Sequence, residues 1–302
     1  MEIRNAGRRD TYDVGSRLPE VVASQRNDRT QPVKKDYIPV SVDASLVDET
    51  AFVEQYWTEM WKDRTGPPEP AGVVRGEEHR VIQPYLAQLR SGTRILDGGC
   101  GMGEWTVFLA RRGFDVVGLD LSESVIQRLK IWFPALQFVR GDIRRTGFPS
   151  GSFDAYLSWG TFEHFEDGLR DCLQEAHRVL QPGGWLFVSV PFDNWRLIVR
   201  EARSLDRWDS TFDRKAGYHR AQRFYQWRLT RPELQRELEL HGFRVHAIKP
   251  IGKLTGAGRM LHWDVRMFRP GSRAYRVARR ALALMMPASF IAHMILAISQ
   301  RR

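Results

Sequence analysis

A glycine-rich turn after a short apolar run constrains this chain more than any other feature of its sequence. Residues 94–97 (Arg-Ile-Leu-Asp) are typical of a strand, and they lead directly into a Gly-Gly-Cys-Gly-Met-Gly turn at residues 98–103. Glycine has no Cβ, so it tolerates unusual backbone conformations and lets a ligand lie against the main chain. A helix predicted from Glu104 presents free N–H groups there, which suit a carboxylate. The pattern predicts a ligand site at the end of a strand.

Strands and helices alternate downstream of this turn. The predicted strands are 94–97, 115–120, 136–139, 153–158, 185–190 and 243–248, with helices at 104–112, 122–132, 167–180 and 232–241. Strands joined by helices of this length form parallel sheets that are covered on both faces. The closing apolar segment at 293–298 has the character of one more strand. The chain is therefore predicted to be an α/β protein.

The spacing of the glycines separates the ligands that such a turn can hold. A dinucleotide site follows Gly-x-Gly-x-x-Gly, whereas here Gly99, Gly101 and Gly103 alternate and Glu104 follows. An acid beside the turn attracts an ammonium group and repels a pyrophosphate. A P-loop is excluded because no Gly-Lys-Ser/Thr follows. The turn favours S-adenosylmethionine, and a nicotinamide-dependent oxidoreductase is the least favoured alternative.

Two further acids follow predicted strands. Asp120 ends the second strand about twenty residues past the turn, where a carboxylate can accept hydrogen bonds from both ribose hydroxyls. Asp142 lies in a Gly-Asp-Ile sequence after the third strand. A lone aspartate at a strand end is more often a cap or turn residue. Three acids in register with a glycine turn, counting Asp97, favour a ligand site.

With these motifs in place, residues 94–191 resemble the S-adenosylmethionine-binding core of the class I methyltransferases, and most closely the type 11 group that includes ubiquinone-biosynthesis-like enzymes. The matching motifs are Leu-Asp-Gly-Gly-Cys-Gly-Met-Gly, Val-Val-Gly-Leu-Asp-Leu-Ser, Gly-Asp-Ile, Phe-Asp-Ala-Tyr-Leu-Ser, Glu-His and Leu-Gln-Pro-Gly-Gly. The resemblance implies a doubly wound, Rossmann-like sheet of seven strands with the last strand antiparallel, and helical cap inserts outside it. The likeness outside this core is weak, so it implies no particular substrate.

The resemblance also implies the residues that hold the cofactor, S-adenosyl-L-methionine. Asp120 is expected to bind the ribose, Asp142 the adenine amine, and Gly99 and Gly101 the methionine portion. The full expected set is Asp97, Gly99, Cys100, Gly101, Gly103, Asp120, Leu121, Asp142, Ile143, Ser158 and Trp159.

Methyl transfer is an in-line displacement on an activated donor, so alignment of the reactants supplies much of the rate. A general base is needed only for an acceptor hydroxyl of high pKa. His164 is the candidate base and Glu163 its orienting partner, because both follow the strand that ends at Ser158 and Trp159. A purely structural role for His164 is an equal alternative. No metal site is predicted.

An aromatic and basic insert at residues 192–228 is expected to fold over the carboxyl ends of the strands, where open α/β sheets bind ligands. Its stacking faces beside guanidinium groups suit a sugar, an aromatic ring or a phosphorylated carrier. The candidate substrate-binding residues are Trp195, Arg196, Tyr218, Arg223 and Tyr225. The alternative is a small helical cap with its own core.

The predicted organisation is a flexible tail at residues 1–48 followed by one domain at 49–302. This domain comprises the cofactor core at 92–191, the substrate-cap insert at 192–228 and a second basic insert at 252–290. The net charge is +10, and from Phe192 to the end there are 23 Lys/Arg against 9 Asp/Glu. The positive field of the last third would attract an anionic partner.

The two cysteines, Cys100 and Cys172, form no paired motif, which favours a reducing compartment. No apolar signal stretch opens the sequence, so a cytoplasmic location is expected. Residues 281–299 are apolar but are interrupted by Pro287 and His293, which favours a buried final strand over a membrane span. The basic helix predicted before this segment leaves peripheral membrane contact as an alternative.

Together these features predict a methyltransferase that O-methylates a small molecule or a glycan- or lipid-linked precursor. An anionic acceptor suits the basic C-terminal third. A nucleic-acid methyltransferase is the second hypothesis, although no Asn-Pro-Pro-Tyr-type motif or RNA-binding module is present. A non-catalytic S-adenosylmethionine-binding protein is the third. The sequence does not indicate an oligomeric state.

Overall fold

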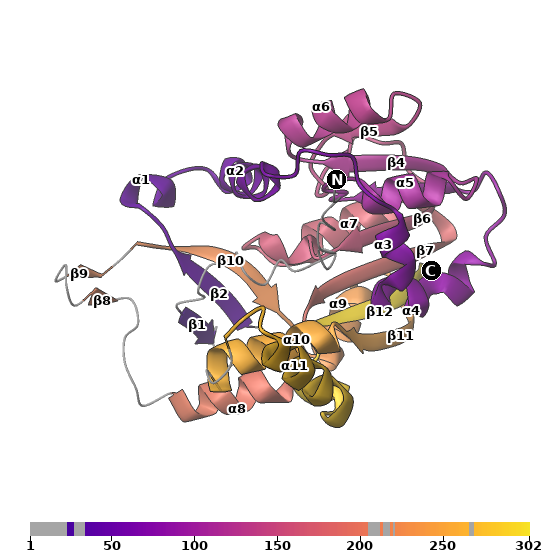
Figure 1. Ribbon diagram of the computed structural model, residues 1–302. Coiled ribbons are helices and arrows are strands. Elements are labelled where there is room, and N and C mark those ends of the chain that lie inside the picture. The colour runs from indigo at the N-terminus through magenta and orange to yellow at the C-terminus, as the bar shows by residue number, and fades with distance from the viewer. Residues whose placement is uncertain (1–22, 27–33, 205–211, 214–217, 220, 266–268) are drawn as a thin grey trace, which may run out of the picture.

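A mixed sheet of seven strands forms the centre of the computed structural model, which describes residues 23–26, 34–204, 212–213, 218–219, 221–265 and 269–302 (Figure 1). In order across the sheet, the strands are β11 (Phe243–Ile251), β12 (Met294–Arg301), β7 (Leu180–Pro191), β6 (Phe153–Trp159), β3 (Arg94–Gly98), β4 (Asp115–Asp120) and β5 (Gln137–Arg140). Strands β7, β6, β3, β4 and β5 run parallel, and β12 is antiparallel to both β7 and β11. The Rossmann-like sheet and its antiparallel last strand are confirmed.

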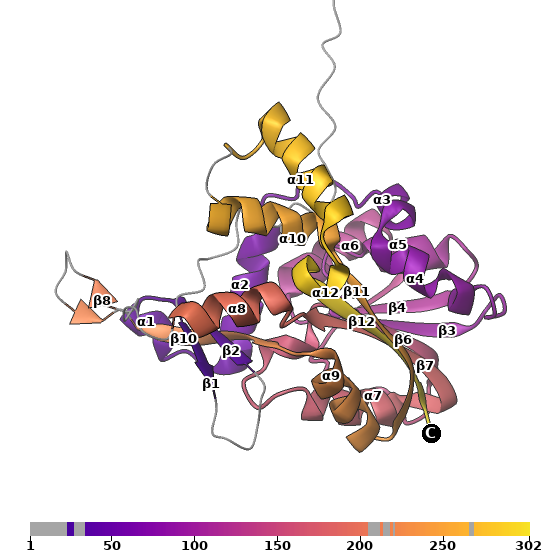
Figure 2. The ribbon, with the colours of Figure 1, turned by 90° about the horizontal axis from the view of Figure 1, so that it is seen from below.

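Helices cover both faces of this sheet, as Figure 2 shows. One face carries α3 (Ala71–Arg75), α4 (Glu77–Leu86) and α5 (Glu104–Ala110), and the other carries α7 (Arg170–Val179) and α9 (Arg231–Leu240). Alternation along the strands explains the two layers: in β3, Ile95 packs with α4 and α5, while Leu96 packs with α7. Helix α6 (Glu123–Trp132) packs on β4 and β5.

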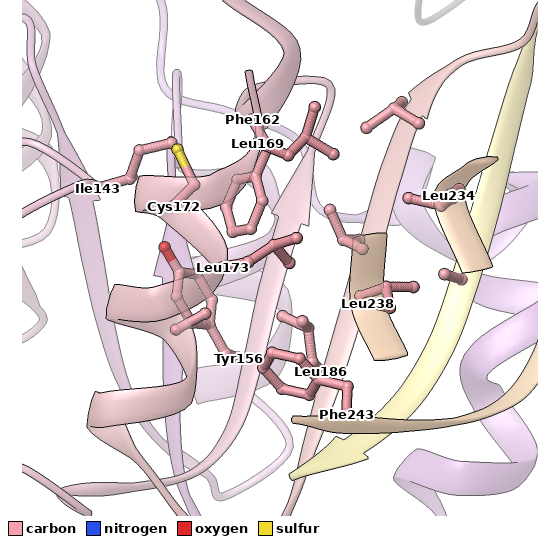
Figure 3. Packing of buried hydrophobic residues seen from close by; sticks show 14 of the residues in the cluster. Ile143, Tyr156, Phe162, Leu169, Cys172, Leu173, Leu186, Leu234, Leu238 and Phe243 are labelled. Carbon is pink, nitrogen blue, oxygen red and sulfur yellow. The ribbon is translucent and has the colours of Figure 1, made fainter. Parts of the chain in front are cut away.

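The largest apolar core lies between the sheet, α7 and α9 (Figure 3). Tyr156 and Leu186 from the sheet meet Leu173 of α7, and Leu238 of α9 joins Phe243 at the start of β11. All five side chains are fully buried. Burying an aliphatic or aromatic side chain contributes about 1.5–3 kcal/mol, so this core holds the strands at fixed positions and aligns their carboxyl ends.

Capping residues place the helix starts next to the strand ends. The Ser122 hydroxyl accepts a hydrogen bond from the Val125 N–H and begins α6 directly after β4. Thr230 and Glu233 form a capping box at the start of α9. Such caps satisfy backbone N–H groups that have no partner within the helix.

The N-terminal region is more ordered than the sequence predicts. Strand β2 (Lys34–Pro39) pairs antiparallel with β10 (Gln222–Arg228), and β1 (Ala23–Arg26) pairs with β2. Helices α1 (Val42–Ser45) and α2 (Glu49–Trp61) follow. The expected flexible tail at 1–48 is therefore wrong for residues 23–26 and 34–45, and residues 1–22 and 27–33 lie outside the described part.

The reason for this error is the charge of the inward-facing positions of β2. Lys34, Asp36 and Ile38 are buried, so the strand alternates, but two of its three inward residues are charged. Their charges are neutralised by Arg228, whose Nε lies 2.9 Å from Asp36 Oδ1, and by Glu201, which pairs with Lys34. These partners are more than 150 residues away in the sequence.

The two predicted inserts differ in structure. Residues 192–228 contain α8 (Trp195–Ser204), the short pair β8 (Phe212–Asp213) and β9 (Tyr218–His219), and β10. The second insert is helical, with α10 (Lys253–Arg259), the π-helical turn η3 (Met260–Val265), α11 (Arg273–Met285) and α12 (Ala288–Ile291). Within the described residues, no helix is both long and apolar enough to span a bilayer.

Candidate functional site

The glycine turn adopts the backbone that its sequence predicts. Gly99, Gly101 and Gly103 have φ values of 73°, 50° and 74°, in the left-handed region that favours glycine. A Cβ on Gly99 would lie 2.4 Å from the Thr161 Oγ1, and one on Gly101 would lie 3.2 Å from the Trp61 ring. The turn therefore needs glycine both for its conformation and for close contact with two other segments.

Asp97 and Asp120 anchor this turn from two sides. The buried Asp97 accepts a 2.6 Å hydrogen bond from the Thr106 hydroxyl, and burial raises the pKa of Asp97 to about 7. Asp120 accepts 2.9 Å hydrogen bonds from the N–H groups of Gly101 and Ser122, one on each oxygen. Each oxygen of Asp120 keeps a further acceptor position, so its carboxylate can still bind the hydroxyls of a ribose.

Asp142 is already paired in this structure. Its Oδ2 lies 2.7 Å from the Arg144 Nη2, and its Oδ1 accepts from the Arg144 backbone N–H at 2.8 Å. Arg144 also reaches α2, where its Nη1 lies 2.8 Å from Glu49. An adenine amine could use Asp142 only by displacing part of this pairing, so the predicted adenine contact requires Arg144 to move.

Helix α2 lies over the carboxyl ends of the strands, a position that we did not predict. The Thr58 hydroxyl lies 2.6 Å from that of Ser122, and Arg140 lies 3.0 Å from Glu54. At its C-terminal end, Trp61 rests on Gly101. The helical spacing of large aromatic residues at 56, 57 and 61 is the sequence signal that could have identified this cover.

His164 lies in the short 3₁₀ turn η2 (Phe162–His164), which follows Thr161 and its contact with Gly99. Its Nδ1 lies 2.7 Å from the carbonyl oxygen of Tyr225, so the neutral ring carries its proton on Nδ1, and the backbone of Gly160 is a second polar neighbour of the ring. The ring packs between Trp57, at 5.0 Å, and Tyr225, at 5.2 Å. Burial lowers the pKa of His164 to about 4, so the imidazole is neutral near pH 7.

Glu163 lies beside His164 and is also buried. Burial raises the pKa of Glu163 to about 8, which keeps most of its carboxyl groups protonated near pH 7. Its Oε1 lies 3.9 Å from the His164 Nε2, too far for a hydrogen bond. Its Oε2 finds no hydrogen-bond partner in the described part of the chain. A buried polar atom without a partner is costly, so this oxygen is available to a bound ligand.

The remaining expected cofactor residues surround the same strand ends. The buried Ser158 donates a 2.8 Å hydrogen bond to the Gly98 carbonyl and ties β6 to β3. The Trp159 ring lies 4.9 Å from that of Trp105, and its buried indole N–H has no partner among the described residues. Cys100 and Ile143 are buried and Leu121 is partly buried.

The predicted substrate residues do not all gather at one place. Tyr225 is buried against Tyr56 and His164, and Arg196 is buried with its Nη1 2.6 Å from Asp264. Arg223 instead donates to the Ala44 and Ser45 carbonyls, so it fixes the chain end of α1. Trp195 is 60% exposed. The side chain of Tyr218 lies outside what the structure describes.

Among the described residues, no group of three or more His, Cys, Asp or Glu side chains could hold a metal ion. The site therefore combines a glycine turn, a carboxylate with spare acceptor positions, a neutral imidazole and a protonated carboxyl. Such a set can hold an S-adenosylmethionine and orient an acceptor beside it.

Comparison with known proteins agrees with this geometry. A family model described as a methyltransferase domain matches residues 74–248, which is more than half of the chain. An uncharacterised methyltransferase of Synechocystis sp. is 39% identical over 128 residues, 40% of this chain and 59% of that protein. A malonyl-[acyl-carrier protein] O-methyltransferase of Enterobacter lignolyticus is 32% identical over 133 residues, 43% and 52% of the two chains. The chain spans about half the length of the curated relatives that it matches.

Solved structures share the fold. An S-adenosylmethionine-dependent methyltransferase from Mesorhizobium loti superposes with a TM-score of 0.50 at 21% identity, covering 76% of this chain and all of that one. A chain from the complex between the Haloferax volcanii Trm112 methyltransferase activator and a methyltransferase gives 0.52 at 17% identity, covering 82% and 96%. At these identities the likeness shows the architecture alone.

Proposed function

This chain belongs to the class I S-adenosylmethionine-dependent methyltransferases, and we propose that it methylates an oxygen of a small molecule or of a glycan- or lipid-linked precursor. The bound cofactor supplies a methyl group already activated on a sulfonium. The residues of this chain then have three tasks, which are to hold the cofactor, to align the acceptor and to accept its proton where one must leave.

One contact carries the proposal. Thr161 lies against Gly99, so the turn that bears Glu163 and His164 is adjacent to the loop expected to hold the methionine portion of the cofactor. This adjacency supports the proposal, because the imidazole of His164 and the unpartnered carboxyl oxygen of Glu163 both belong to that turn. A group with a pKa of about 4 is a weak base. It suits an acceptor whose hydroxyl is acidic, or one that is already an anion and needs no base.

Transfer of labelled methyl from S-adenosylmethionine into a fractionated cell extract tests this proposal. We expect label in a small-molecule or lipid fraction, where the methyl group is attached to oxygen as an ester or an ether. His164→Ala should lower the transfer at least tenfold while S-adenosylhomocysteine binds with unchanged affinity, in line with the usual contribution of a general base. Label confined to RNA or DNA would support the nucleic-acid alternative. Tight cofactor binding with no label in any fraction would support a non-catalytic role.

We also propose that the exposed face of α11 contacts an anionic membrane surface. Val277, Leu284 and Met285 are largely exposed on this helix, and the same helix carries four arginines and no acid: Arg273, Arg276, Arg279 and Arg280. Figure 2 shows α11 standing away from the sheet. Basic helices with exposed apolar residues bind at the interface of anionic bilayers.

Sedimentation with vesicles of phosphatidylglycerol and phosphatidylcholine tests this contact. We expect the wild-type protein to bind only vesicles that contain the anionic lipid, and the Leu284→Glu variant to bind at least tenfold more weakly. Leu240→Glu, at an equally exposed apolar position on α9, is the matched control. Equal binding by all three proteins would contradict a role for α11.

A further inference from the structure

Helix α10 packs closely against its neighbours and ends at Arg259. The helix begins after Gly252, whose φ is 74°. A Cβ on Gly256 would lie only 1.6 Å from the Ile291 carbonyl oxygen, and one on Gly258 would lie 2.8 Å from the Tyr275 hydroxyl. Both glycines are buried, so α10 is closely packed against its neighbours. The backbone of Arg259, at the C-terminal end of this helix, is therefore held in place.

The guanidinium of Arg259 has no paired counter-charge among the residues that the structure describes. No hydrogen bond or ion pair forms to it within the described residues. Burial, with additional effects of Arg196 and Arg228, lowers the pKa of Arg259 to about 10. It therefore stays charged at neutral pH in a partly exposed position, where a bound anion would stabilise it.

The carboxylates near Arg259 are already engaged. Asp264 lies 2.6 Å from Arg196 and 3.6 Å from Arg200, so a single carboxylate forms ion pairs with two arginines. Asp36 is paired with Arg228 at 2.9 Å. Glu163, whose pKa is about 8, is mostly uncharged near pH 7. Among the described residues, no carboxylate is left to pair with Arg259, so an anion from outside the chain would balance its charge.

Two more observations indicate that a ligand belongs here. Arg196 is only 8% exposed, and its buried Nε has no hydrogen-bond partner among the described residues. Burial, together with the nearby charges of Arg259 and Arg196, lowers the pKa of the partly exposed His293 well below the usual value. A neutral His293 can donate a hydrogen bond without adding charge.

Tyr225 connects this cluster to the methyl-transfer site. Its ring lies 5.2 Å from that of His164, and its carbonyl binds the His164 Nδ1. Its hydroxyl is within electrostatic range of both Arg259 and Glu163. An acceptor that reaches from Glu163 past Tyr225 would therefore place its far end against Arg259.

We propose that Arg259, supported by Arg196 and His293, binds a carboxylate or phosphate group of the methyl acceptor. This inference rests on the proposed function, because it concerns the acceptor of the same reaction. An arginine can grip either group with two parallel hydrogen bonds. The site thus selects acceptors that carry an anionic group some distance from the oxygen that receives the methyl.

Calorimetric titration of the protein loaded with S-adenosylhomocysteine tests this inference, with inorganic phosphate and acetate as separate probes. We expect one of the two anions to bind, and Arg259→Gln to weaken that binding at least tenfold, as loss of a charged hydrogen-bond partner implies. Arg280→Gln, at an exposed position of α11, should leave it unchanged. The probe that binds more tightly identifies the group as phosphate or carboxylate.

The same variants separate this inference from the proposed function. Arg259→Gln should bind S-adenosylhomocysteine as the wild type does, and without added anion it should melt at an equal or higher temperature because an uncompensated charge is removed. No binding of either anion to the wild type, or unchanged binding by Arg259→Gln, overturns the anion site. Reduced S-adenosylhomocysteine affinity in Arg259→Gln assigns the residue to the cofactor instead. Failure of the wild type to bind S-adenosylhomocysteine overturns the proposed function itself.

Discussion

At the scale of single residues, Asp120 has both a structural and a proposed binding role. It accepts one backbone N–H on each oxygen, from Gly101 and from Ser122, so the carboxylate that we propose for ribose binding also holds the glycine turn. We expect Asp120→Asn to weaken S-adenosylmethionine binding about tenfold or more, because the amide keeps only one acceptor oxygen. Isothermal titration measures this affinity.

The control for this prediction is Asp115→Asn, on the exposed first residue of the same strand. It should bind the cofactor normally, and circular dichroism should show both variants folded. Normal affinity in Asp120→Asn would remove Asp120 from the cofactor site.

Glu163 makes the stability of the protein depend on pH. Its pKa is about 8 in the folded chain against 4.5 for a free side chain, so between these values the folded state binds more protons than the unfolded state. The stability that the neutral carboxyl contributes is therefore complete below about pH 4.5 and is lost as the pH rises through 8.

We expect Glu163→Gln, which cannot ionise, to gain stability relative to the wild type as the pH rises from 5 to 9. The gain should approach roughly 3–5 kcal/mol, given 1.36 kcal/mol per pKa unit. Urea unfolding at several pH values measures it, with Glu166→Gln at a largely exposed position as the control. A constant difference between wild type and Glu163→Gln across this range would contradict a raised pKa.

At the scale of secondary-structure elements, α2 covers the glycine turn through Trp61. The helix is joined to the rest of the molecule by polar contacts at Glu49, Glu54 and Thr58 and by partly buried aromatic rings, and none of its residues is fully buried. Polar surface contacts contribute little free energy each, so α2 is held less firmly than the helices of the core. A cover of this kind can shift when a ligand binds under it.

Trp61 reports on such a shift because its ring rests on Gly101. We expect S-adenosylhomocysteine to change the tryptophan fluorescence of the wild type, and Trp61→Phe to lose most of that change while its affinity stays within a few-fold. Trp195→Phe, at an exposed position on α8, should keep the full signal. An undiminished signal in Trp61→Phe would place the ligand away from α2.

At the scale of the whole molecule, a buried ionic cluster joins segments that are remote in sequence. Arg228 of β10 contacts Asp36 of β2, Asp193 after β7 and Glu201 of α8. The cluster ties the N-terminal strand to the insert and to the end of the central sheet. Taking charges out of water is costly, so its value depends on every partner being present.

We expect Arg228→Met to destabilise the protein by about 3–5 kcal/mol, since it leaves Asp36 and Asp193 buried without their shared cation. The midpoint of urea unfolding measures the loss. Arg244→Met, on an exposed position of β11, should change it by less than about 0.5 kcal/mol. A loss that small in Arg228→Met would show that the cluster contributes little to stability.

The alternating strands and helices, the glycine turn and the acids at the strand ends were all predictable from sequence. Each of these signals is local, since hydrophobic period, capping residues and glycine conformation depend on residues within a few positions. The seven-stranded sheet with its antiparallel last strand followed from the resemblance to class I methyltransferases, and the structure confirms it.

Only the tertiary structure decided which residues surround the turn. The cover by Trp61, the pairing of Asp142 with Arg144, and the displacement of Arg223 from the site all depend on contacts between distant segments. The strand at Lys34–Pro39 was missed for the same reason, because its buried charges are tolerated only where Arg228 and Glu201 are brought to them. A local sequence pattern predicts the conformation and chemical type of a residue. Its contacts depend on the fold, because burial and charge pairing involve residues far apart in the chain.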